Sequence, residues 1–124
     1  MHALQLCDWT VVRVPTIATI TQGEDQWLDL APFQECVIWV DCREATNTVT
    51  LSLQTSPTKD EAYFKNLVAT ITLASGPTPT AYTALLDSAP TPLARWLRWQ
   101  FASTIIGPAD AQFRIWVSAN SPGM

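Results

Sequence analysis

The sequence predicts an all-β protein, an antiparallel β-sandwich of about eight strands with a jelly-roll or discoidin-like arrangement. Three observations support this prediction. Apolar and polar residues alternate with a period of two in several segments, as in strands with one buried face. These segments follow one another at short intervals, and turns containing Pro, Gly or Asp separate them. No segment shows the apolar spacing of a strong amphipathic helix.

The N-terminal half contains four segments with strand character. Residues 9–20 are rich in β-branched side chains, and Pro15 within them indicates a bulge, a strand break or an edge position. A polar turn leads to a short strand over 27–30. Residues 35–43 and 48–55 then alternate almost without interruption. These four segments are expected to be strands of the sandwich.

The C-terminal half continues the same pattern. We expect a strand over 62–73 with a bend near Asn66, although a helical start over 59–67 is an alternative. A short strand follows over 81–86, after a Pro-rich turn. The last two strands, over 93–101 and 111–119, alternate clearly and close the pattern.

A chain of 124 residues has the length of one domain. The strands place that domain at residues 9–119. Residues 1–8 are then expected to be an N-terminal arm that becomes ordered on a partner, and residues 120–124 to be a short C-terminal tail.

Composition excludes several classes of protein. Apolar residues make up 48% of the chain and charged residues 15%, which excludes an intrinsically disordered chain. No apolar run approaches the roughly 20 residues that cross a bilayer, so we expect no membrane contact. The net charge of −4 with 7 basic residues argues against a nucleic-acid partner, because such binding requires clustered Lys and Arg.

The three cysteines predict free thiols. An odd number does not close a disulfide framework. Cys36 and Cys42 share one face of a predicted strand at a separation of roughly 20 Å, which is beyond disulfide reach. Residues 1–8, which include Cys7, lack the basic and apolar regions of a secretory signal. We therefore expect buried thiols in a reducing compartment.

No residue pattern indicates catalysis, a cofactor or a metal. His2 is the single histidine, and no Cys-x-x-Cys pair is present, so a zinc site is not expected. Glu24, Asp25 and Asp29 cluster around a turn, but calcium requires 6–8 oxygen ligands. No nucleophile, phosphate-loop or metalloprotease motif occurs. We expect a protein that is not an enzyme, although two distant carboxylates of a glycosidase would leave no motif.

The side of the predicted strands opposite the core carries an unusual set of residues. Trp and Arg are the side chains most enriched at the energetic centres of protein interfaces, and Arg stacks favourably on Trp. We interpret this set as an interface with another protein, most simply a second copy. Ordinary core or loop-covered packing and a ligand platform are the alternatives. The set consists of Trp39, Asp41, Arg43, Trp96, Arg98, Arg114 and Trp116.

Three segments together resemble a known fold family. The run TVTLSLQTSPTKDEAYFKNLVA and the later runs PLARWLRWQF and AQFRIWVSA are similar to strands of discoidin-like, galactose-binding-like β-sandwiches. The resemblance covers residues 35–119. Domains of this kind also occur in small phage virion proteins, as capsid-decorating, tail or fibre modules. The chain lacks the disulfide that joins the ends of the sugar-binding and lipid-binding members, and it has no aspartate-rich calcium loop.

The resemblance and the Trp/Arg set lead to one expected function and two alternatives. We expect a structural protein, most simply a phage virion component, that forms homo-oligomers and docks on a capsid or tail. It would be located in the virion, and in the host cytoplasm before assembly. The first alternative is a carbohydrate-binding module that stacks exposed Trp on a glycan. The second is a host-interaction or inhibitor protein with the same fold.

Overall fold

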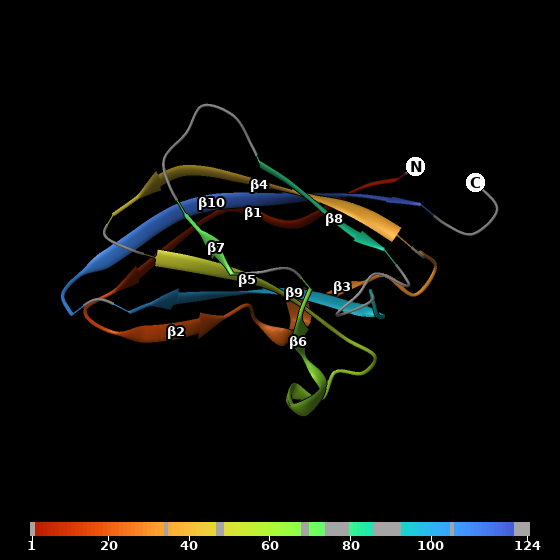
Figure 1. The fold of residues 1–124 in the computed structure, drawn as a ribbon, viewed down its shortest axis with the longest axis horizontal. Coiled ribbons are helices and arrows are strands. Elements are labelled where there is room, and N and C mark those ends of the chain that lie inside the picture. Colours follow the sequence, from red (N-terminus) through yellow and green to blue (C-terminus); the bar gives the residue numbers. More distant parts are fainter. Residues whose placement is uncertain are drawn as a thin grey trace.

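A computed structural model describes residues 2–33, 35–46, 49–67, 70–73, 80–85, 93–104 and 106–120. These residues form two antiparallel sheets that lie one above the other (Figure 1). The predicted all-β sandwich is therefore confirmed.

The first sheet has the strand order β1-β10-β4-β8. Long strands dominate it, and β10 pairs along its length with β1 on one side and β4 on the other. In Figure 1 this sheet is the upper layer, so its outer face points away from the second sheet. Its strands are β1 (His2–Val14), β10 (Ala109–Asn120), β4 (Glu35–Ala45) and β8 (Thr80–Leu85).

The second sheet follows the order β2-β9-β5-β6, and two further short strands, β3 and β7, pair with β9 and β5. Two single 3-10 turns, η1 (Glu24–Gln26) and η2 (Glu61–Tyr63), lie in the connections around this sheet. Its strands are β2 (Ala18–Thr21), β9 (Trp96–Ser103), β5 (Val49–Ser56), β6 (Lys65–Asn66), β3 (Leu28–Asp29) and β7 (Ile71–Thr72).

The hydrophobic core fills the space between the two sheets. Leu51 and Phe101 from the second sheet and Phe113 and Ile115 from the first are completely buried. The Trp99 ring meets the Phe113 ring edge to face, with centroids 5.1 Å apart, and so joins the layers. The alternation predicted over 48–55, 93–101 and 111–119 is confirmed for the described residues, because its inward apolar positions are buried; Thr55 and Arg98 are buried as well.

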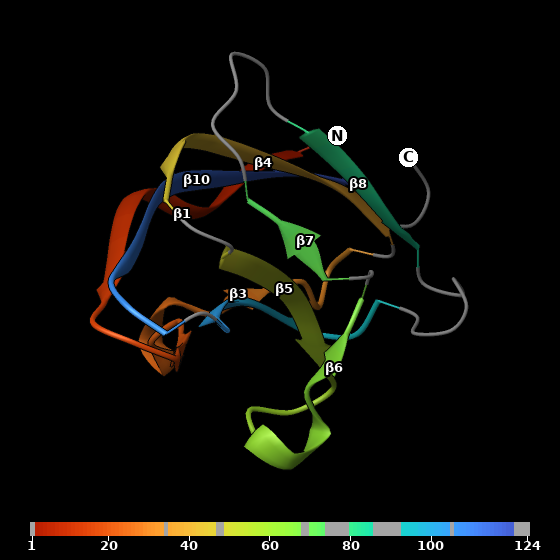
Figure 2. The same cartoon turned by 60° about the vertical axis from the view of Figure 1, so that its left-hand side comes forward.

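Two of the connections that cross between the sheets lie next to each other at one end of the sandwich. Pro15 follows β1, and after three residues outside the strands the chain enters β2 in the other sheet, so the predicted strand break is confirmed. The segment from β9 to β10 crosses in the opposite direction, and Gly107 in it has φ 117°, which favours glycine. The crossings run side by side (Figure 2), because Val14 pairs with Ala109 and Ala18 pairs with Ser103.

The structure corrects the arm expected at residues 1–8. Residues 2–8 are the first half of β1, where His2 pairs with Ala119 and Leu4 with Val117. Leu6 is buried, so the apolar alternation begins before residue 9. The boundary at residue 9 is therefore wrong. At the other end β10 continues to Asn120, and residues 121–124 of the expected tail lie outside the described residues.

The single strand expected over 62–73 is also corrected. The segment begins with η2, which Asp60 caps by accepting a hydrogen bond from the Ala62 backbone N–H at 3.0 Å. Two short strands follow, and both β6 and β7 pair with β5. The helical alternative over 59–67 is realised as one 3-10 turn, since the capped turn ends at Tyr63.

The three cysteines are free thiols, as predicted. Cys36 and Cys42 lie on the buried face of β4, and Cys7 is half-buried in β1. Burial raises the pKa of Cys36 to about 12 and that of Cys7 to about 11, and it also raises the pKa of Cys42. Each thiol is therefore protonated near neutral pH, and a protonated thiol is a poor nucleophile.

We expect the folded protein to react slowly with a disulfide thiol reagent at pH 8, because burial and a raised pKa both protect the thiols. In denaturant the protein should react quickly and release three equivalents of the reagent's thiolate per chain. The absorbance of that thiolate, followed with time under both conditions, measures the difference. Rapid release of two or more equivalents from the folded protein would contradict the burial of Cys36 and Cys42.

Candidate functional site

The structure places the seven predicted site residues on two different sheets. Five of them share the outer face of the first sheet, on the neighbouring strands β4 and β10. They are Trp39, Asp41, Arg43, Arg114 and Trp116. The other two, Trp96 and Arg98, lie on β9 in the second sheet. The expectation of one continuous face is wrong for these two, because alternation assigns a side of a strand and does not assign the strand to a sheet.

Trp39 and Trp116 lie at one end of the five-residue group. They are directly opposite each other in the antiparallel register of β4 and β10. Trp39 is 42% exposed and Trp116 is 38% exposed, although both are large apolar residues. Opposed residues in such a pair have Cβ atoms about 5 Å apart, so the two indoles present one continuous apolar surface to solvent.

Trp9 from β1 joins this group and was not anticipated from the sequence. The guanidinium carbons of Arg43 and Arg114 each lie 4.6 Å from the centroid of the Trp9 ring. Arg114 also binds Asp41, with Nη2 3.2 Å from Oδ2. The stacked ring restricts both guanidinium groups, and the carboxylate also restricts that of Arg114. This lowers the conformational entropy that these side chains would lose on binding a partner.

Irregular pairing in β1 accompanies the position of Trp9. The register between β1 and β10 shifts twice, between Gln5 and Cys7 and again between Cys7 and Thr10. Within this stretch the Asp8 carboxylate accepts the Trp9 backbone N–H at 2.8 Å. Bulges of this kind redirect side chains, and residues 5–10 contain no Gly or Pro that would indicate them. We call the outer surface formed by Trp39, Asp41, Arg43, Arg114, Trp116 and Trp9 the tryptophan face.

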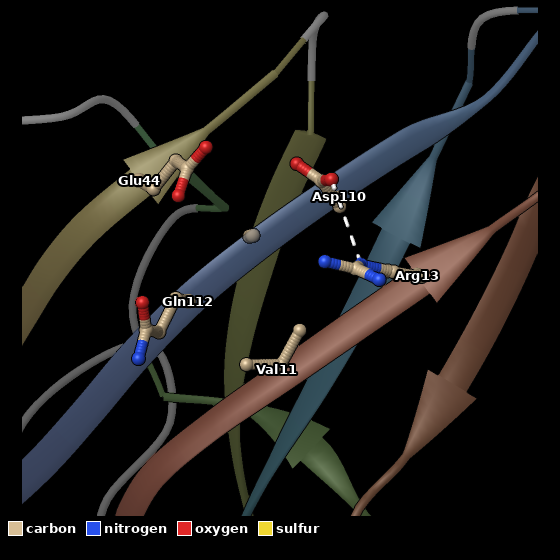
Figure 3. Close-up of a pocket in the computed structure, with 6 residues that line it drawn as sticks. Val11, Arg13, Glu44, Asp110 and Gln112 are labelled. Carbon is tan, nitrogen blue, oxygen red and sulfur yellow. Dashed lines mark ion pairs between the residues drawn. The ribbon is translucent and has the colours of Figure 1, made fainter.

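A small pocket adjoins the tryptophan face (Figure 3). Val11, Arg13, Glu44, Asp110, Ala111 and Gln112 line it. Arg13 and Asp110 point toward each other across the neighbouring strands β1 and β10, with Nε 3.8 Å from Oδ2. The pocket has a volume of about 60 Å³. Sites for small organic ligands usually enclose roughly 300–1,000 Å³, so this pocket suits a few water molecules.

Arg98 has a structural environment rather than an exposed one. Its side chain is 3% exposed, because η1 and η2 cover the outer face of β9. Nη1 donates to Glu61 Oε1 at 2.7 Å, and Nε donates to Gln54 Oε1 at 2.8 Å. Its guanidinium carbon lies 3.8 Å from the Phe64 ring centroid and 5.1 Å from that of Trp27. The loop-covered alternative for the Trp/Arg set is therefore correct at Arg98.

We call Arg98 together with Gln54, Glu61, Phe64 and Trp27 the Arg98 clamp. The hydrogen bond from Arg98 lowers the pKa of Glu61 below its ordinary value, so Glu61 stays ionised at neutral pH. Trp96 is half-buried, and it contacts the Lys59 ammonium at 4.5 Å and the Arg95 guanidinium at 5.1 Å. Glu61, in the loop tip at 59–61, supplies the carboxylate that neutralises Arg98.

The acidic residues near η1 do not gather into a metal site. Glu24 and Asp25 are exposed in the 3-10 turn. Asp29 binds Arg95 through both carboxylate oxygens, at 3.1 and 3.0 Å, and these hydrogen bonds lower the pKa of Asp29. Across the described ranges, no group of three or more His, Cys, Asp or Glu side chains is arranged to hold a metal ion. None of the described residues forms a helix long and apolar enough to cross a membrane.

Comparison with known proteins identifies a fold relative. No protein-family model matches the chain, and a search of curated proteins found no match. Among solved structures, the chain is similar to a chain in the structure of infectious bursal disease virus, Gx strain, with a TM-score of 0.53 and 11% sequence identity. The similarity covers 98% of this chain and 33% of that one, so this chain spans about a third of the viral chain. At this identity the similarity shows a shared fold, and the discoidin-like assignment stays a prediction.

Proposed function

We propose that this chain is a structural protein of a virus particle, with no catalytic role, that contacts neighbouring protein subunits through the tryptophan face. The observation that carries the proposal is the pair of exposed indoles, Trp39 and Trp116, beside two guanidinium groups that are already stacked on Trp9. A lone soluble domain gains nothing from this arrangement, whereas an interface gains apolar area and oriented donors.

Two further observations support a virion role. A sandwich of this fold occurs in the structure of infectious bursal disease virus. The resemblance of residues 35–119 to small phage virion modules favours a capsid-decorating or tail-associated component, present in the host cytoplasm before assembly. The pocket beside the tryptophan face is too small for a substrate, so protein contact is the use that the face supports best.

Particle fractionation tests this proposal. We expect the wild-type chain to sediment with purified virus particles at a fixed ratio to their main protein, and the Trp39→Ser/Trp116→Ser variant to remain in the soluble fraction. Tyr63→Ser provides the matched control, because Tyr63 is exposed on η2 beside the other sheet. Absence of the wild-type chain from the particles would contradict the proposal. Glycan-dependent quenching of Trp fluorescence would instead favour the carbohydrate-binding alternative.

A further inference from the structure

The outward side chains of β4 have opposite charges at equal distances from Trp39. Glu35 lies four residues before Trp39 and Arg43 lies four residues after it, each at roughly 13 Å along the strand. On β10, Gln112 and Asn120 lie four residues on either side of Trp116; Asn120 is the register partner of Glu35, whereas a register shift at Arg43 pairs Gln112 with Glu44. Because Trp39 and Trp116 are register partners, one line across the two strands is the centre of both patterns.

Glu35 and Arg43 have no ionic partner among the described residues, although neighbouring charges on the same face do. Arg114 binds Asp41, and Arg13 binds Asp110. Glu35 accepts a hydrogen bond from the Asn120 amide at 2.8 Å, and Arg43 lies over the Trp9 ring. Asp8 of β1 is exposed and accepts the Trp9 backbone N–H. The residues of β8, the remaining strand of this sheet, include no Asp, Glu, Lys or Arg. Glu44 lines the pocket of Figure 3 beyond Arg43.

We infer that the tryptophan face binds a second copy of this chain about a two-fold axis. The axis lies parallel to the sheet face, perpendicular to the strands, and passes over Trp39 and Trp116. The inference rests on the proposed function and adds the partner and its symmetry. Such an axis stacks each strand on its own copy with reversed direction. Glu35 of each copy then faces Arg43 of the other, which gives two equivalent ion pairs at the ends of the interface.

The other residues that this axis brings together also form favourable contacts. Each indole meets its counterpart at the centre, where apolar residues contribute most to binding. Gln112 meets Asn120 of the second copy, and two side-chain amides can exchange hydrogen bonds. Val37 meets Asp41, whose carboxylate Arg114 already binds. A glycan would use the indoles but would not require opposite charges placed symmetrically around them.

The size of the first sheet suits this interface. Strands of 11–13 residues span roughly 40 Å, and four strands side by side span roughly 15 Å. That outline approaches the area of about 800 Å² that each partner buries in a stable protein interface.

Charge reversal tests the axis. We expect Glu35→Arg and Arg43→Glu each to weaken dimerisation at least about a hundredfold, because each change places like charges together at two symmetric sites. The Glu35→Arg/Arg43→Glu double variant should return to within about tenfold of the wild-type dissociation constant, because the pairing is restored with reversed signs. Sedimentation velocity over a concentration series measures all three.

Glu24→Arg and Lys65→Glu are the matched controls, because both residues are exposed and lie outside the first sheet. They should leave the dimer unchanged. Urea unfolding verifies that each variant folds, and Glu35→Gln with Arg43→Gln replaces any reversal that does not. A wild-type monomer, or a double variant weaker than both single ones, would overturn the inference. A dimer that neither Glu35→Arg nor Arg43→Glu weakens would also overturn it. The particle assay would still decide the proposed function in that case.

Discussion

The Trp39→Ser/Trp116→Ser variant should remain folded and should lose about a thousandfold in affinity between copies. A tryptophan at the centre of an interface contributes about 2 kcal/mol or more, and two such residues correspond to about three orders of magnitude in the dissociation constant. Both indoles lie on the outer side of the first sheet, away from the core. We therefore expect the free energy of unfolding of the monomer to change by less than about 1 kcal/mol.

Sedimentation velocity of this variant beside wild type measures the loss of affinity. Tyr63→Ser is again the control, because it removes an exposed aromatic ring near the second sheet and should leave association intact. Equal association of the double variant and the wild type would mean that the exposed indoles do not form the contact. A large decrease in the urea midpoint would mean that these indoles stabilise the single chain.

The Arg98→Ala variant should lower the free energy of unfolding by about 3 kcal/mol. The substitution removes the hydrogen bonds to Glu61 and Gln54 and the contacts with the Phe64 and Trp27 rings. Trp27 and Phe64, which follow η1 and η2, would then lose the side chain on which they pack. Arg98→Met should recover a large part of the loss, because methionine restores apolar contact without burying a charge.

Urea unfolding at neutral pH measures both variants, and the acid range provides a second measurement. The pKa of Glu61 is lowered in the folded state, so its stabilisation is present above its ordinary pKa and disappears as pH falls through the lowered value. Glu61→Gln should therefore flatten the acid part of the stability curve. An Arg98→Ala variant within about 0.5 kcal/mol of wild type would contradict the clamp.

Period-two alternation was sufficient to predict the fold class and the burial of most strands. In β4 and β10 each buried position is apolar and each outward position was assigned correctly, because both strands are long and one of their faces is fully covered. Pro15 marked the break between β1 and β2 because proline lacks the N–H that a strand ladder requires. Burial within a strand and the end of a strand depend on neighbouring residues, so the local sequence is enough to predict them.

The features that the sequence did not predict depend on contacts between distant segments. Arg98 has the same outward alternation as Arg114, yet residues from 27 to 64 enclose it. Trp9 contacts the Arg43 and Arg114 guanidinium groups because two register shifts interrupt β1. That stretch contains no Gly or Pro from which the shifts could be predicted. Sheet membership and loop covering are tertiary properties, so alternation alone cannot provide them.

Hydroxyl-radical footprinting across a concentration series tests most directly whether the tryptophan face is covered in the assembled protein. Exposed indoles oxidise readily, so the account predicts that Trp39 and Trp116 are oxidised in dilute protein and protected in concentrated protein or in particles. Tyr63 should be oxidised equally throughout, because it lies outside the face. Equal oxidation of Trp39 and Trp116 at every concentration, and in particles that contain the chain, would contradict the account.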